Sequence, residues 1–451
     1  MQRIAWQYER AGNRMDGTVA TIGAGQVRAG IDPRARRAIA AACIGNMLEW
    51  YDFGVYAFLA GAISAAFFPS SDPTASLLAT FAAYGVGFLA RPFGGAVIGR
   101  LGDRRGRKVA LVLTLLMMAL GTIGLGLLPT YAQIGIAAPA LLVALRILQG
   151  IAAGGEWGAS TAFIIEWAPE GRRGLFGSFQ QVSTASGILL GSGVAALLTS
   201  LLTPEAMLAW GWRIPFLLGA SLLVVGILIR RSVDETPVFE DQVARKDAAP
   251  VAPAQESGPR LGLRAFGFTI FWTVSYYMLL SYMPTFTQKF GALTASQALW
   301  SNTIGLVAMV LAVPVFGHVS DRVGRKPLLI ASAVAAILLS YPLFRIIAGG
   351  AGFLTVVAIQ VVFGLIVALY SGPGPAAISE MFPSHLRSTW MSIGYTLAVA
   401  VFGGFAPFVA TWLIAVTGSP LAPGALYLIP MAVLTLVVVA RMPETGKSRL
   451  A

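Results

Sequence analysis

Five charged residues stand inside long apolar stretches of this chain, where a charged side chain is expected either to do chemistry or to pair. Glu49 and Asp52 are three residues apart, so on a helix they share one face. Arg91, Arg146 and Glu156 follow in later apolar stretches. A charge placed in an apolar interior costs about 2.5–3.5 kcal/mol on insertion scales, so each of the five requires a compensating role.

Transport chemistry would use both signs of charge. A buried guanidinium can hold a carboxylate through two parallel hydrogen bonds, and a buried carboxyl group takes up a proton more readily than it does in water. A substrate that competes for the same arginine would link its own binding to proton binding. We therefore predict that Arg91 and Arg146 bind substrate and that Glu49, Asp52 and Glu156 couple protons. The alternative is that these residues form fixed ion pairs that brace one helix bundle.

Three aromatic residues in the second half of the chain are predicted to complete the substrate site. Trp272, Tyr276 and Tyr277 lie within about one and a half helical turns of each other. Their ring faces could hold the cationic group of a zwitterion. Ordinary helix packing is the alternative for all three.

The composition indicates a membrane protein. Of the 451 residues, 56% are hydrophobic and only 12% are charged, whereas soluble domains have about 25% charged residues. The apolar stretches are about twenty residues long, which favours helices over the short alternating strands of a β-barrel. The chain has one cysteine, Cys43, and two histidines, His318 and His385, without ligand-like spacing. We therefore expect no disulfide framework, metal site or cofactor.

Twelve apolar stretches divide into six, a polar break and six more. They lie at 38–67, 76–99, 109–128, 134–156, 175–200, 213–230, 264–288, 298–317, 327–346, 352–377, 389–415 and 423–440. The sequence thus predicts an all-α membrane protein with twelve transmembrane helices in two six-helix bundles. The predicted parts are a disordered tail (1–36), an N-terminal bundle (37–230), a linker (231–262), a C-terminal bundle (263–441) and a second tail (442–451).

The basic residues predict the orientation. Most of the 32 Lys and Arg fall in the tails, the linker and alternate loops, while the loops at 68–76, 129–133 and 416–422 have none. By the positive-inside rule both termini are cytoplasmic. The net charge of +12 therefore reflects topology, and we expect no nucleic-acid partner.

Two loop motifs occur once in each half, which indicates that the halves share one plan. GRLGDRRGRK at 99–108 matches GHVSDRVGRK at 317–326, and EWAP at 166–169 matches EMFP at 380–383. Charges in these loops could pair across the seam between the bundles and close a cytoplasmic gate; the alternative is that they only enforce topology. The predicted gating residues are Asp103, Arg104, Arg107, Glu166, Asp321, Arg322, Arg325 and Glu380.

These loops resemble the signature of the major facilitator superfamily, as does Arg146 with Gln149, Gly150 and Gly154. Further segments resemble its metabolite:H⁺ symporter family. They are GNMLEWYDF at 45–53, RPFGG at 91–95, GGEW at 154–157, WGWRIPF at 210–216 and DETP at 234–237. The resemblance covers about residues 40–440. It implies the superfamily's fold, with transport by alternating access at a site between the two halves.

The resemblance also indicates the class of substrate. That family takes up α-ketoglutarate, citrate, shikimate, and proline or betaine. The run YYMLLSYMP at 276–284 resembles the proline/betaine branch, and AVFGGFAP at 400–407 resembles the citrate branch. Our main prediction is proton-coupled import of a small organic acid, such as α-ketoglutarate, citrate or another di- or tricarboxylate. The alternative is a proline/glycine betaine osmoprotectant symporter.

Other classes of protein fit the sequence less well. No nucleotide-binding G-x-x-x-x-G-K-[ST] occurs, and no catalytic set of Ser, His and Asp stands in the apolar stretches, so we predict neither an ATP-driven pump nor an enzyme. A channel would not explain two matched charged loops, and measured substrate flux would exclude a receptor. The expected partners are a carboxylate solute, protons and the lipid bilayer. We expect a monomer in a bacterial inner membrane.

Overall fold

The computed structural model describes most of the chain. The described ranges are 33–105, 107–154, 156–166, 168–219, 257–383 and 386–446. Residues 1–40 and 41–451 form separate compact units. Of the first unit only the helical residues from Pro33 onward are described, and all contacts reported below lie within the second unit. We call residues 41–219 the N-half and residues 257–446 the C-half.

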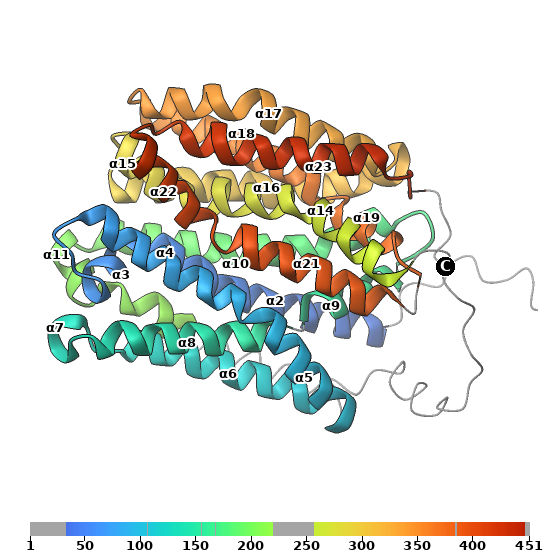
Figure 1. Ribbon diagram of the computed structural model, residues 1–451, viewed down its shortest axis with the longest axis horizontal. Helices are drawn as coiled ribbons and strands as arrows, with labels where there is room; N and C mark the ends of the chain where they lie inside the picture. The colour runs from blue at the N-terminus through green and yellow to red at the C-terminus, as the bar shows by residue number, and fades with distance from the viewer. Residues whose placement is uncertain are drawn as a thin grey trace, which may run out of the picture. The chain divides into compact units, whose positions relative to one another are not determined.

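The N-half consists of helices joined by short turns (Figure 1). They are α2 (Pro33–Phe58), α3 (Ala60–Phe67), α4 (Pro73–Leu89), α5 (Arg91–Arg105), α6 (Arg107–Leu127), α7 (Tyr131–Ile134), α8 (Ala137–Ala153), α9 (Glu156–Glu166), α10 (Arg173–Leu201), α11 (Pro204–Ala206), the π-helix η1 (Met207–Gly211) and a helix at 213–219. In this half α6 packs on α8, and α8 packs on α4 and α5. This packing places the arginines of α5 and α8 against α2.

The C-half is also helical, and several of its helices contain π-helical turns. Its elements are α14 (Gly258–Tyr276), η2 (Tyr277–Tyr282), α15 (Met283–Phe290), α16 (Ala295–Val323), α17 (Lys326–Ala348), α18 (Phe353–Ser371), α19 (Gly374–Glu380), η3 (Arg387–Met391), α21 (Ser392–Ala398), η4 (Val399–Gly403), α22 (Ala406–Thr417), η5 (Pro423–Leu428) and α23 (Ile429–Arg441). A π-turn adds a residue to the helical repeat and often marks a functional segment. The turn η2 begins at Tyr277, the last of the three aromatic residues that the sequence singles out.

The predicted all-helical membrane fold is confirmed. Eight helices of the described ranges are long and apolar enough to cross a membrane, from Pro73–Ile98 to Pro423–Arg441, and Val112–Leu127 and Ala137–Ala153 are shorter apolar helices. The two remaining predicted spans correspond to α2 with α3 and to the helix at 213–219, beyond which the description stops. No strand occurs among the residues that the structure describes.

The two halves meet along α10 and α16, which pack side by side in Figure 1. Close approach depends on glycine. A Cβ on Gly174 would lie 2.4 Å from the Gly317 carbonyl oxygen, and a Cβ on Gly317 would lie 2.6 Å from the Gly174 carbonyl oxygen. Neither position can take a side chain without moving a helix.

The predicted domain boundaries stay predictions. Residues 1–32 of the first tail and 220–256, which hold most of the linker, lie outside the described residues. The helix α14 begins at Gly258, inside the predicted linker. Of the second predicted tail, residues 442–446 are described, and Glu444 among them binds the loop before α17.

Candidate functional site

A pocket lies where α2 and α10 of the N-half face α14 and α21 of the C-half. It is lined by Trp50, Gln181, Thr184, Trp272, Thr273, Tyr276, Tyr277 and Tyr395. The cavity has a volume of only about 20 Å³, which is room for about one water molecule. The pocket is therefore nearly closed in this structure and has to widen to admit even a small molecule. All of these lining side chains are aromatic or neutral and polar.

Aromatic rings form two clusters at the pocket. Trp50 lies with its ring centroid 6.0 Å from both Tyr276 and Tyr277. The ring centroids of Trp272 and Tyr395 lie 5.9 Å apart. Tyr395 also stacks face to face on Trp157, with 3.4 Å between their ring centroids. The predicted substrate residues Trp272, Tyr276 and Tyr277 therefore do line one pocket. The packing of Gly403 against Thr273 and Tyr277 allows η4 to approach this face of α14.

The first acid–arginine pair lies behind the pocket wall. Arg91 Nη2 lies 3.1 Å from Glu49 Oε1, and both side chains are buried. The Arg91 guanidinium also lies 4.4 Å from the ring centroid of Phe88 and 5.3 Å from that of Trp50. Arg91 is not itself a lining residue, because Trp50 occupies the pocket surface beside it.

The second pair is more deeply enclosed. Asp52 accepts hydrogen bonds from Thr122 Oγ1 at 2.9 Å, from Gln149 Nε2 at 2.7 Å and from Arg146 Nη1 at 3.3 Å. Arg146 is fully buried, with its guanidinium 4.1 Å from the Tyr56 ring centroid. Removing one partner of such a pair costs about 3–5 kcal/mol. Arg146 does not line the pocket, so its surroundings are those of a brace within the N-half.

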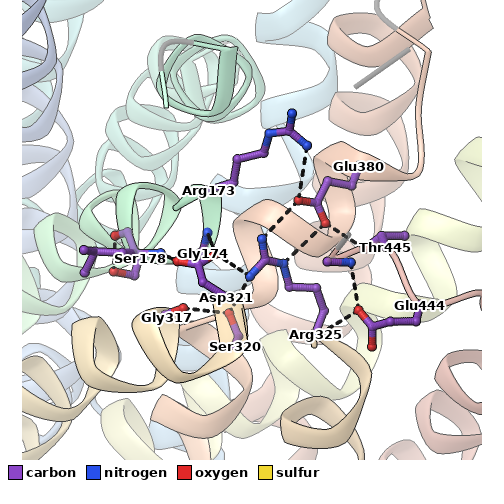
Figure 2. A network of polar contacts seen from close by, with 12 residues as sticks. Arg173, Gly174, Ser178, Gly317, Ser320, Asp321, Arg325, Glu380, Glu444 and Thr445 are labelled. Carbon is purple, nitrogen blue, oxygen red and sulfur yellow. Dashed lines mark hydrogen bonds and ion pairs between the residues drawn. The ribbon is translucent and has the colours of Figure 1, made fainter. Parts of the chain in front are cut away.

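A network of charges lies at the end of the molecule that we predict to be cytoplasmic (Figure 2). Arg325 Nη1 lies 2.7 Å from Asp321 Oδ1, and Arg325 Nη2 lies 3.2 Å from Glu380 Oε1. Burial alone would lower the pKa of Arg325, but the Glu380 and Asp321 carboxylates outweigh burial and hold that pKa above its usual value. The structure thus brings three predicted gating residues into contact.

This network joins the two halves. Asp321 accepts hydrogen bonds from the backbone N–H groups of Gly174 and Leu175, at 2.8 and 2.9 Å, where α10 begins. The positive end of the α10 dipole favours a carboxylate there. Arg173 Nη1 lies 4.0 Å from Glu380 Oε1, and Figure 2 shows the two side chains pointing toward each other. A further link joins Arg387 Nη1 to Glu166 Oε1 at 2.9 Å.

Glu444 and Thr445, near the end of the described residues, also bind this network. Glu444 accepts hydrogen bonds from the backbone N–H groups of Arg325, Lys326 and Gly446, at 2.8, 3.0 and 2.8 Å. Burial alone would raise the pKa of Glu444, but these N–H groups and the Arg325 charge hold it below its usual value. Thr445 Oγ1 donates to Glu380 Oε2 at 2.7 Å, so the C-terminal segment contacts the gate directly.

Of the remaining predicted residues, only Arg322 has a described side chain. Arg322 is exposed, and no ion pair of its side chain is found in the described ranges. The side chains of Asp103, Arg104, Arg107 and Glu156 lie outside the described part of the structure, so their roles stay predictions. No group of three potential metal ligands occurs in the part of the chain that is described.

Some functional residues escaped prediction from the sequence. Trp50 stands beside Glu49 in a motif singled out for other reasons, while Thr273 and Tyr395 carry no charge to mark them. Arg173 and Arg387 follow the two EWAP-type motifs at the same spacing. This second repeat was a signal for the gate that could have identified both arginines.

Two family models match the chain in succession. The model described as "Sugar (and other) transporter" matches residues 38–258, and that described as "Major Facilitator Superfamily" matches residues 265–450. Among solved structures, the partially occluded inward-open xylose transporter XylE from E. coli matches with a TM-score of 0.74 at 19% identity, over 92% of this chain and 99% of that chain. At this identity the likeness shows the fold alone.

Curated relatives are closer in sequence. The glycine betaine/proline/ectoine/pipecolic acid transporter OusA of Dickeya dadantii is 35% identical, over 93% of this chain and 85% of its own length. The proline/betaine transporters of Salmonella typhimurium and Escherichia coli are each 34% identical, over the same shares of both chains. All three of these relatives are named as transporters, not as enzymes.

Proposed function

Since the chain belongs to the major facilitator superfamily, we propose that it imports a small zwitterion of the proline and betaine class together with protons, by alternating access. The chain is a bacterial multi-pass membrane transporter and not an enzyme. The relatives favour the predicted alternative over our main prediction of an organic acid. The finer substrate assignment is the proposal.

The lining of the pocket is the observation that carries the proposal. Its residues include five aromatic rings and no charged side chain. A di- or tricarboxylate would bring two or three negative charges into this lining without a partner, which is costly. A zwitterion has no net charge, and its ammonium group suits aromatic faces.

Proton coupling is assigned to Glu49. Its carboxylate is buried beside the pocket wall and paired with Arg91. Protonation of Glu49 would break this ion pair and leave the Arg91 guanidinium free to reorient next to Trp50, which does line the pocket. Solute binding and proton binding could therefore act on one another through Trp50. Asp52 is assigned the bracing role, because its acceptors are already bound by Thr122, Gln149 and Arg146.

Alternating access would open and close the charged network. Its cross-half contacts join Asp321 to the start of α10, Arg173 to Glu380 and Arg387 to Glu166. When the halves rock apart at this end, these contacts break and the pocket is exposed to that side. The predicted orientation makes this side cytoplasmic.

Uptake into proteoliposomes tests the proposal. Purified protein is reconstituted with an inward proton gradient and supplied in parallel with labelled glycine betaine, proline, α-ketoglutarate and citrate. We expect accumulation of glycine betaine or proline that a protonophore abolishes. Accumulation of only an organic acid would overturn the substrate class, and accumulation that resists the protonophore would overturn proton coupling.

A further inference from the structure

Three hydroxyl groups on α14 and the start of η2 are buried without a hydrogen-bond partner among the described residues. They are Thr273 Oγ1, Tyr276 Oη and Tyr277 Oη. The three side chains are at most 4% exposed, and all three line the pocket. Their spacing of three and four residues places them on one face of the helix.

Buried hydroxyl groups in folded proteins normally have partners, and a group without one destabilises the fold. Several other buried tyrosines here follow that rule. Tyr370 donates to the Phe268 carbonyl oxygen at 2.7 Å, and Tyr427 donates to the Phe402 carbonyl oxygen at 2.7 Å. Other buried polar atoms of the described residues also have no partner, but these three hydroxyl groups gather on one face of the pocket, which indicates that a ligand accepts their hydrogen bonds.

We propose that Thr273, Tyr276 and Tyr277 bind the carboxylate of the transported zwitterion, and that the ring faces of Trp50, Trp272 and Tyr395 hold a methylated ammonium group at its other end. The assignment rests on the proposed function, since it concerns the same pocket and solute. It departs from the predicted role of Arg91 and Arg146 as carboxylate ligands.

The position of the arginines supports this departure. Arg91 is paired with Glu49 and lies against the Phe53 and Phe88 rings, at 4.6 and 4.4 Å from their centroids. Arg146 is committed to Asp52 and Gln149. A carboxylate that enters the pocket meets the three hydroxyl groups without displacing either ion pair.

The cationic end of the solute meets rings and no acid. A quaternary ammonium group has no N–H to donate, so aromatic faces satisfy it fully. The secondary ammonium of proline has two N–H groups, and each needs an acceptor that a ring does not provide. The pocket is therefore expected to favour N-methylated zwitterions over proline.

Binding to the purified full-length protein, measured by titration calorimetry with glycine betaine and with choline, tests the assignment. Choline has the same trimethylammonium group and no carboxylate. Each of Tyr276→Phe, Tyr277→Phe and Thr273→Val is expected to weaken betaine binding about tenfold or more, and to leave choline binding within about twofold. The matched control Tyr427→Phe removes a hydroxyl group that does not line the pocket and is expected to keep betaine binding.

A fold defect cannot imitate this result, because the three variants remove groups that have no partner among the described residues and are therefore expected to keep or raise the melting temperature. Betaine binding that is unchanged in all three variants would overturn the assignment, as would an equal loss of betaine and choline. Wild-type protein that binds α-ketoglutarate but no betaine would instead overturn the proposed function.

Discussion

Two acid–arginine pairs on neighbouring turns of α2 have different surroundings, and the difference separates their roles. Asp52 is held by three donors in the closed interior of the N-half. Glu49 lies beside Trp50, a residue of the pocket wall, and pairs with Arg91, with 3.1 Å between Glu49 Oε1 and Arg91 Nη2. A proton carrier has to change partners during the cycle, which suits Glu49.

Glu49→Gln is expected to reduce proton-driven accumulation at least about tenfold, while solute exchange across the membrane continues. The amide keeps a hydrogen-bond acceptor for Arg91 but cannot bind and release a proton. Uptake and counterflow in proteoliposomes measure the two activities separately. The control Asp72→Asn changes an exposed carboxylate that caps α4 and keeps both. Normal accumulation by Glu49→Gln would assign the proton to another group.

Burial of these charges was predictable from the sequence, but their pairing was not. The apolar surroundings of Glu49, Asp52, Arg91 and Arg146 are visible in the sequence. Which arginine meets which acid depends on how each helix rotates against its neighbours. That rotation is set by packing details such as the Gly87 contact with the Arg146 carbonyl oxygen.

At the scale of elements, the contact between α10 and α16 is set by two glycines. Gly174→Ala would place a methyl group 2.4 Å from the Gly317 carbonyl oxygen and from Ser320 Oγ. Such overpacking costs about 1–3 kcal/mol, so we expect a lower melting temperature and weaker uptake. On the same helix, a Cβ at Gly193 meets nothing within 4 Å, so Gly193→Ala is the matched control. Equal melting temperatures and equal uptake of the two variants would show that the close contact at Gly174 is not required.

The helix α17 has an unusual cap, because Glu444 from the far end of the chain accepts its first N–H groups. The pKa of Glu444 is lower in the folded protein than its ordinary 4.5. Its charge therefore stabilises the fold above about pH 4.5, and that stabilisation is lost as the pH falls through the folded pKa.

Glu444→Gln is accordingly expected to lower the melting temperature at pH 7, by an amount that corresponds to about 0.3–1 kcal/mol. The difference from the wild type should shrink when melting is repeated near pH 4. Glu170→Gln, which changes an exposed carboxyl group, should show no such difference. A difference that stays constant with pH would exclude the charge as its cause.

The helices themselves were largely predictable, and their ends were less so. The predicted span 298–317 lies within α16, which runs from Ala295 to Val323. The hydropathy signal covers only the apolar residues that would face the hydrocarbon. The helical hydrogen bonds continue beyond them into polar residues. The π-turn η2 has no comparable signal, because Tyr277–Tyr282 reads as an ordinary apolar helix.

At the scale of the whole molecule, contacts between the halves lie on both sides of the pocket. Ion pairs hold the predicted cytoplasmic end. Towards the other end, Phe81 of α4 packs on Tyr282 of η2, and Lys289 Nζ approaches Thr74 Oγ1 at 3.4 Å. Transport requires that these two sets of contacts break in turn.

Glu166→Arg is expected to lower uptake severalfold, because it places a like charge beside Arg387 and favours separation of the halves at this end. Combination with Arg387→Glu should restore part of the uptake. Recovery should be incomplete, since Arg387 also donates to the Ser379 and Phe382 carbonyl oxygens. Glu170→Arg in the same loop serves as the control. An unaffected Glu166→Arg variant would remove this pair from the gate.

The repeat of two loop motifs predicted charges that pair across the seam between the halves, whereas Asp321, Arg325 and Glu380 meet within the C-half. The contacts across the seam were not predictable. Asp321 binds backbone N–H groups of α10, which belong to every helix start and leave no mark in a sequence.

The uncharged lining of the pocket has an electrical consequence. A zwitterion bound there moves no net charge, so at one proton per solute each cycle carries a single positive charge inward. A membrane potential of about 100 mV supplies about 2.3 kcal/mol to that charge, which corresponds to a solute concentration ratio of roughly fifty. A potassium diffusion potential, negative inside and imposed by valinomycin at equal pH on both sides, should therefore drive uptake by itself.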